Sequence, residues 1–124
     1  MKLSTLLIIT AVVSILFGLA MVFVPGQLHA LYDAPEGAMN YDMQLWGSAL
    51  ITIGLFSWLA RNVQQKDAQR AIILSLFIGN GFGFVLSLIG QINNVLNAMG
   101  WSSVVIYLLL AVGFGYFQFV KSPS

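Results

Sequence analysis

Four long apolar segments, joined by short polar ones, run through this chain. They cover residues 3–24, 43–60, 71–90 and 101–120, and none has Asp, Glu, Lys, Arg or His in its interior. A membrane-spanning helix needs about 20 mostly apolar residues. The pattern therefore predicts an all-α fold: a single domain over residues 1–124 that forms a membrane-spanning four-helix bundle.

The first apolar segment ends at Pro25-Gly26, a pair that interrupts a regular helix. A cleaved signal peptide is the alternative interpretation. However, the uncharged stretch is longer than the roughly 7 to 15 apolar residues of a signal-peptide core. Residues 27–33 follow, with Leu28, Leu31 and Tyr32 spaced three and four apart. We expect a short helix there that lies in the membrane interface, before Pro35 and Gly37 turn the chain back.

The polar connection from Arg61 to Arg70 contains neither Gly nor Pro. The neighbouring helices are therefore expected to extend into it, with Asp67 capping the third spanning helix.

The basic residues all fall on one side of the membrane that this pattern implies. They precede the first span, lie between the second and third, and follow the fourth: Lys2, Arg61, Lys66, Arg70 and Lys121. Because Lys and Arg in short loops favour the cytoplasmic side, both termini and the middle loop are predicted to be cytoplasmic. Trp46 and Trp101 would then anchor the outer ends of their helices, and Trp58 the inner end.

Small side chains recur every four residues along the third span, at Ala71, Ser75, Gly79, Gly83 and Ser87. Such rows let helix backbones approach closely in lipid. We therefore predict that Ser75, Gly79, Gly83 and Ser87 form a helix-packing face. Ser14-Gly18 in the first span and Ala111-Gly115 in the fourth are candidate partners. Contact inside one bundle and contact between two copies both stay open.

Asn80 is the strongly polar side chain nearest the centre of a span. In hydrocarbon its amide must face protein or water, which indicates an interhelical hydrogen bond or, as the alternative, contact with a bound ligand. Other amides cluster near the outer surface, where we expect them to be hydrated: Gln44, Gln91, Asn93, Asn94 and Asn97.

Composition narrows the chemistry. The chain is 59% hydrophobic and 7% charged, has a net charge of +1, and contains no cysteine. This balance gives no basic surface for nucleic acid, and it leaves no thiol for catalysis, disulfides or metal binding. His29, Asp33, Glu36 and Asp42 share the outer loop without a recognised ligand spacing. We therefore predict no enzymatic activity, catalytic residue, cofactor or metal.

Two pairs of short sequences hint at an internal repeat. Gly26-Gln27-Leu28 matches Gly90-Gln91-Ile92, and the segment from Trp46 to Ile51 matches the one from Trp101 to Ile106. Both matches fall at the same predicted depth, so a repeat would relate two parallel hairpins. Chance similarity between apolar helices is the alternative.

The chain also resembles the small bacterial four-helix membrane proteins called DoxX-like. The residues that carry the resemblance are Pro25, Tyr32, Asp42, Gly47, Gly54, Trp58, Arg61 and Arg70, within segments such as LWGSALITIGLFSWLAR. The resemblance implies a four-helix bundle in a bacterial inner membrane, and it supplies no reaction or site residue.

These observations favour a non-enzymatic integral inner-membrane protein that acts by helix packing, as an accessory subunit or a homo-oligomer. Its expected partners are the lipid bilayer and either another membrane protein or a second copy of itself. The alternative is a small transporter or binder that holds a lipophilic or neutral molecule between its helices, beside Asn80.

Overall fold

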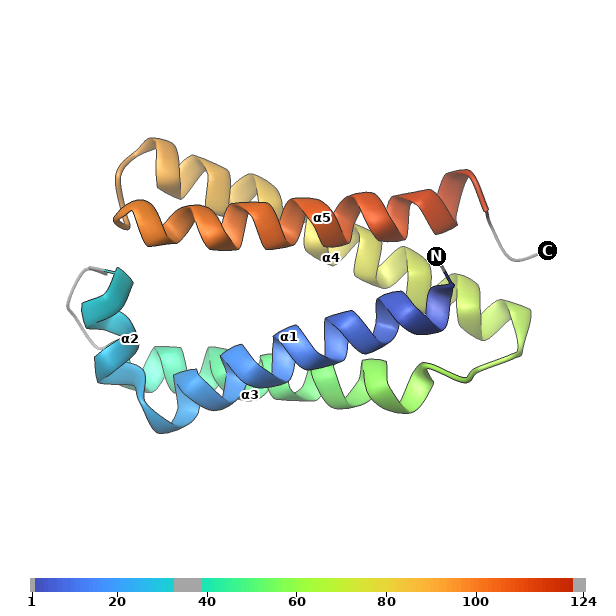
Figure 1. Ribbon diagram of the computed structural model, residues 1–124, viewed down its shortest axis with the longest axis horizontal. Helices are drawn as coiled ribbons and strands as arrows, with labels where there is room; N and C mark the ends of the chain where they lie inside the picture. Colours follow the sequence, from blue (N-terminus) through green and yellow to red (C-terminus); the bar gives the residue numbers. More distant parts are fainter. Residues whose placement is uncertain (1, 33–38, 122–124) are drawn as a thin grey trace. The chain divides into compact units, whose positions relative to one another are not determined.

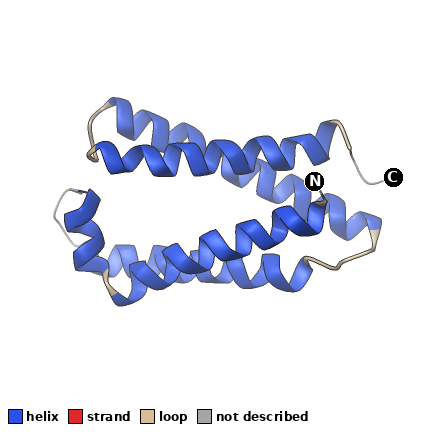
Figure 2. Cartoon of the chain, viewed as in Figure 1, coloured by secondary structure: helices blue, strands red, loops and turns tan. Residues whose placement is uncertain are grey.

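The computed structural model describes residues 2–32 and 39–121, and in this part of the chain every regular element is helical (Figures 1 and 2). The elements, in order, are α1 (Leu3–Phe23), α2 (Pro25–Tyr32), α3 (Met39–Ala60), α4 (Lys66–Ile92), the short 3₁₀ helix η1 (Ala98–Gly100) and α5 (Trp101–Phe119). They form two compact units, Met1–Arg61 and Asn62–Ser124.

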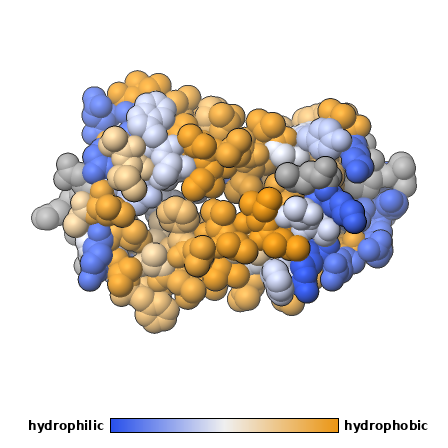
Figure 3. Space-filling view, viewed as in Figure 1, coloured by the Kyte–Doolittle hydropathy of each residue, from blue (hydrophilic) through white to orange (hydrophobic). Residues whose placement is uncertain are grey.

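Among the described residues, four helical segments are long and apolar enough to cross a membrane: Leu3–Phe23, Asp42–Ala60, Lys66–Ile92 and Ala98–Phe119. At 1.5 Å per residue, the 21 residues of α1 extend about 32 Å, close to the thickness of a bilayer's hydrocarbon core. Figure 3 shows hydrophobic residues along the middle of the helices and hydrophilic ones near their ends. For the described residues, the prediction of an all-α chain with four helices long and apolar enough to cross a membrane is confirmed.

In the first unit, α1 and α3 lie side by side and run in opposite directions (Figure 1). The buried positions along α1 alternate in spacings of four and three: Leu7, Ala11, Ser14, Gly18 and Met21. That spacing is the seam of a left-handed helix pair. Other faces of α1 expose large apolar side chains such as Leu16 and Phe23, which suits contact with lipid tails.

The change from α1 to α2 occurs where Val24 leaves the helical region, with φ −133° and ψ 51°. Pro25 is the first residue of α2, a position where its fixed φ and missing N–H are tolerated. The predicted short helix is therefore present, and it begins at Pro25. Across the unit, Gln44 Nε2 of α3 donates a hydrogen bond of 3.1 Å to the Val22 carbonyl near the end of α1.

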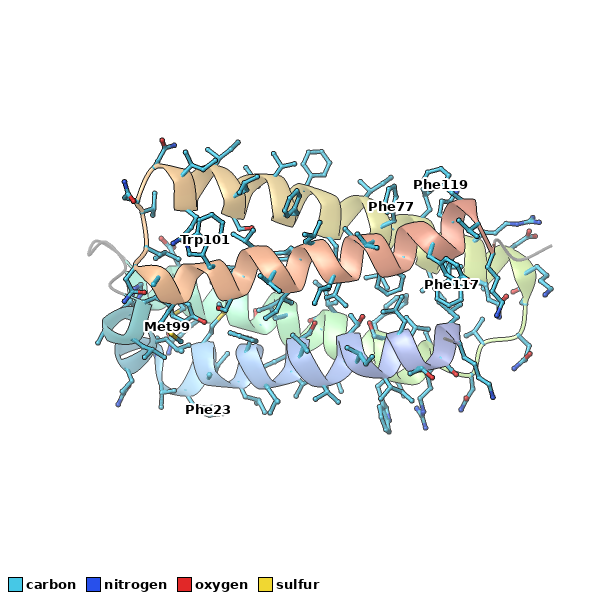
Figure 4. The ribbon with its side chains drawn as sticks, turned by 45° about the horizontal axis from the view of Figure 1, so that its top comes forward. Phe23, Phe77, Met99, Trp101, Phe117 and Phe119 are labelled. Atoms are coloured by element: carbon cyan, nitrogen blue, oxygen red, sulfur yellow. The ribbon has the colours of Figure 1, made fainter. Side chains whose placement is uncertain are left out.

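In the second unit, α4 and α5 also pack against each other, and η1 connects them (Figure 1). The chain reverses through Asn94, whose φ of +58° is one that Asn tolerates better than most residues. At the opposite end of the unit, the rings of Phe77 and Phe119 meet edge to face, with centroids 5.4 Å apart (Figure 4).

The middle connection is more helical than its polar composition suggests. The expected extension occurs on one side: α4 begins at Lys66 rather than at Ala71, whereas α3 ends at Ala60 and does not enter the connection. The prediction that Asp67 caps this helix was wrong. Gln65 is the N-cap residue and makes no side-chain cap, while Asp67 lies inside the first turn, 3.5 Å from the Arg70 guanidinium. A carboxylate in the first turn still interacts favourably with the helix dipole.

Candidate functional site

The row of small residues on α4 crosses the helix surface obliquely. Ser75 and Gly79 are exposed, whereas Gly83 and Ser87 are partly buried. Four residues of an α-helix turn slightly more than one full circle, so each step along the row shifts by about 40°. The row consequently starts on an exposed side of α4, at Ser75 and Gly79, and reaches the side that contacts α5 at Gly83.

Gly83 already has a partner inside its own unit. A Cβ atom at this position would collide with the ring of Tyr107 from α5. Ser87 is also occupied locally, because its hydroxyl donates a 3.1 Å hydrogen bond to the Phe84 carbonyl of the same helix. Gly83 therefore belongs to the α4–α5 contact, whereas the Ser87 hydroxyl is bonded within α4 itself.

Gly79 is placed differently. A Cβ atom there would meet no other heavy atom within 4 Å, apart from its own helix backbone and chain neighbours. Together with Ser75, Phe82 and Leu86 it forms an exposed line with spacings of four, three and four. Phe82 and Leu86 are each 66% exposed. We call these four residues the α4 open face: a glycine notch beside two large apolar side chains.

The expected partner helices are arranged otherwise than the sequence indicated. Ser14-Gly18 was a candidate partner of the third spanning helix, but the atoms nearest the Cβ position of Gly18 all belong to Gly47 and Ile51 of α3. Gly115 does lie against α4, where a Cβ atom would be 3.0 Å from the Phe77 ring rather than against the small-residue row. Close backbone approach is thus used between α1 and α3, whereas Gly115 of α5 accommodates an aromatic side chain of α4.

Sequence reasoning missed the close approach of the α1 and α3 backbones in the first unit. A Cβ atom on Gly47 would lie 2.8 Å from the Gly18 carbonyl oxygen, and one on Gly18 would lie 2.7 Å from the Gly47 oxygen. Two helical turns further along α3, Gly54 faces Ile15 and the Ala11 carbonyl. The available signal was the seven-residue spacing of Gly47 and Gly54, which matches the seam on α1.

Asn80 is 9% exposed. Its Nδ2 donates a 2.7 Å hydrogen bond to the Leu76 carbonyl, one turn earlier in α4. The amide donor is therefore partly satisfied by its own helix, without a ligand.

The amides near the helix ends are not all hydrated. Gln91 is 7% exposed and donates a 2.8 Å hydrogen bond from Nε2 to the Asn97 carbonyl, so the expectation of a hydrated side chain was wrong for this residue. Asn97 Oδ1 in turn accepts a hydrogen bond from the Met99 amide. Gly100 completes the corner, since a Cβ there would strike the Gln91 side chain. Burial is compatible with polarity here because Gln91 has a backbone partner.

The tryptophans lie where interfacial anchors should. Trp46, Trp58 and Trp101 are 50%, 42% and 46% exposed, each near the end of a spanning segment. Figure 4 shows Trp101 where α5 begins. Their roles in a bilayer stay predictions.

No group of three or more potential metal ligands occurs within residues 2–32 and 39–121. Of the outer-loop residues considered for cation binding, Asp33 and Glu36 lie outside the described residues, as do Pro35 and Gly37 of the expected turn. His29 lies in α2, and both of its ring nitrogens are buried without a hydrogen-bond partner.

No protein-family model, curated protein or solved structure matches this chain. The resemblance to DoxX-like proteins therefore stays a hypothesis, and the function must be argued from the residues themselves.

Proposed function

We propose that this protein acts in the membrane by lateral helix packing, as a homo-oligomer or an accessory subunit, and that the α4 open face is its contact surface. The proposal rests mainly on the open space at Gly79, where an added Cβ atom would meet nothing within 4 Å, on a helix long enough to span the bilayer. Helices in lipid associate mainly through van der Waals contact and weak polar contacts, so a glycine notch beside large apolar side chains suits a second helix.

The distribution of charge supports a defined orientation. In the first unit, Lys2 precedes α1 and Arg61 follows α3, so the antiparallel packing brings both to one end. In the second unit, Lys66 and Arg70 begin α4 and Lys121 follows α5, again at one end. We place these basic ends, and with them both termini, on the cytoplasmic side of a bacterial inner membrane. A reporter fused to the C-terminus that is active only in the cytoplasm tests this orientation.

Asn80 bears on the alternative of a transporter or a binder of neutral molecules. Its amide donor is bonded to Leu76, which favours a structural role for this side chain over contact with a ligand.

The absence of cysteine from the sequence allows a sharp test of self-association. Gly79→Cys places a thiol in the notch, and Val85→Cys places one elsewhere on α4, at a residue that is 49% exposed. We expect oxidation in native membranes to give a covalent dimer with Gly79→Cys and little with Val85→Cys. Comparing the two variants distinguishes cross-linking at a specific surface from cross-linking by random collision, because both thiols lie on the same spanning helix.

Gly79→Leu provides the complementary test. Its Cβ atom would meet nothing within 4 Å, whereas the Cβ atom of Gly83→Leu would strike Tyr107 and disturb the second unit itself. Native mass spectrometry of the wild type should show a homo-oligomer or a stoichiometric second protein, and Gly79→Leu should release it. A wild-type monomer, or an assembly unchanged by Gly79→Leu, would refute the proposed surface.

A further inference from the structure

The end of α3 carries a cation held in a fixed position. The guanidinium carbon of Arg61 lies 4.0 Å from the centroid of the Trp58 ring. Its Nη1 also donates a hydrogen bond of 2.5 Å to the Trp58 carbonyl. Stacking on an aromatic face and bonding to a carbonyl at a helix C-terminus both favour an arginine here. The side chain has therefore given up much of its rotational freedom before any ligand arrives.

This arrangement leaves most of the guanidinium unused. The bond to Trp58 takes one N–H, and an arginine presents several more in a planar fork. Within the described residues, the ion pair of a basic side chain with a carboxylate is the one between Arg70 and Asp67. Arg61 thus keeps hydrogen-bond donors and a full positive charge for a partner outside the chain.

The surroundings indicate the chemistry of that partner. Trp58 is 42% exposed, and the neighbouring Leu59 is 76% exposed. Both lie in the last turn of a spanning segment. A tryptophan in such a position lies at the level of the lipid headgroups, with apolar side chains facing the acyl chains. Phosphate is the anionic group found at this depth, and a planar guanidinium fork matches its oxygens.

We propose that Arg61, oriented by Trp58, binds the phosphodiester group of a phospholipid at the end of α3. The acyl chains of this lipid would lie along the exposed apolar side chains of α3, beginning at Leu59. Free inorganic phosphate shares the same oxygen chemistry but offers no apolar portion for that surface, so we assign the site to lipid. The inference is independent of the α4 open face, which lies in the other unit.

Native mass spectrometry of the full chain, with added phosphatidylglycerol, measures the proposed binding. Arg61→Gln should weaken retention of the lipid about tenfold, the effect of losing one charge-assisted contact. Arg70→Gln is the matched control. It removes the same charge from a residue already paired with Asp67, and retention should change less than about twofold. Trp58→Leu keeps the charge yet should also weaken retention, because Arg61 is no longer oriented.

Two measurements on the wild type keep the proposal open to refutation even if a variant folds poorly. The wild type should prefer phosphatidylglycerol over a glycolipid that lacks phosphate, and excess inorganic phosphate should not displace the lipid. Equal retention of both lipids, displacement by inorganic phosphate, or equal losses in Arg61→Gln and Arg70→Gln would each overturn the assignment.

Discussion

The two helical units use glycine in different ways. In the first unit, glycines let backbone meet backbone: the position of a Cβ on Gly47 is 2.8 Å from the Gly18 oxygen, and the reverse distance is 2.7 Å. In the second unit, glycines accommodate aromatic rings. Tyr107 occupies the space over Gly83, and the Phe77 ring lies 3.0 Å from the Cβ position of Gly115.

The difference concerns what can move. A carbonyl oxygen in a helix is fixed by the helix, so an added methyl group in the first unit must separate α1 from α3. An aromatic side chain can shift by a few tenths of an ångström within its rotamer. Gly47 of the first unit should therefore tolerate an added methyl group less well than Gly115 of the second.

The two units also treat their polar ends differently. Gln44 of the first unit is exposed where it bonds to the Val22 carbonyl, whereas Gln91 of the second is buried against the corner formed by Asn97 and Gly100. A buried hydrogen bond is costly to remove because the partner left behind loses its hydration as well. The second unit thus relies more on one amide, and the first more on close backbone contact.

The largest effect is expected for Gly47→Ala. The new methyl group would lie 2.7 Å from Met21 Cβ and 2.8 Å from the Gly18 oxygen, and neither atom is the end of a flexible side chain. We expect a loss of about 2 to 3 kcal/mol in the free energy of unfolding, measured in mixed detergent micelles. Gly81→Ala is the control, because its Cβ position meets nothing within 4 Å. Equal behaviour of the two variants would contradict the close backbone contact.

A second large effect is expected in the second unit, for Gln91→Leu. Leucine preserves most of the side-chain volume but leaves the Asn97 carbonyl without its donor. We expect a loss of about 1 to 2 kcal/mol in unfolding free energy. Gln44→Leu, at an exposed position in the first unit, should cost less than half as much. If Gln44→Leu proves the more harmful change, the assignment of burial to the second unit is wrong.

The sequence predicted the membrane class and the four spans because these depend on length and average polarity alone. The apolar runs 3–24 and 101–120 coincide closely with α1 and α5. The start of α4 at Lys66 was harder to place, since a polar segment without Gly or Pro is compatible with helix or loop. Hydropathy determines where a chain can enter lipid, and it says little about where a helix begins in water.

The packing partners were less predictable. An i, i+4 repeat of small residues identified α4 as unusual, yet the repeat winds around the helix, so that Gly79 and Gly83 have different surroundings. Gly18 and Gly47 form their contact through positions set by the relative register of two helices, which a single sequence does not specify. Likewise, the burial of Gln91 follows from the fold of the residues 94–100 around it.

A smaller effect is expected for Gly115→Ala, the counterpart of Gly47→Ala in the second unit. The methyl group would lie 3.0 Å from the edge of the Phe77 ring, which can shift. The higher helix propensity of alanine offsets part of the strain. We expect a change in unfolding free energy of less than about 1 kcal/mol, measured as for Gly47→Ala. A loss as large as that of Gly47→Ala would show that the Phe77 ring accommodates a methyl group no better than the helix backbone does.

The smallest effect is expected at the basic ends, for Asp67→Asn. This change breaks the ion pair with Arg70. The Arg70 side chain is 54% exposed and the Asp67 side chain is 85% exposed. Exposed pairs of this kind contribute about 0.5 kcal/mol or less, and salt screens them. The loss in unfolding free energy should therefore nearly vanish at high salt. Arg61→Gln in the first unit removes a ring contact and a bond to a carbonyl, neither of which joins two ions, so its effect should persist in salt. The contrast would be contradicted if the loss in unfolding free energy depended strongly on salt for Arg61→Gln and not at all for Asp67→Asn.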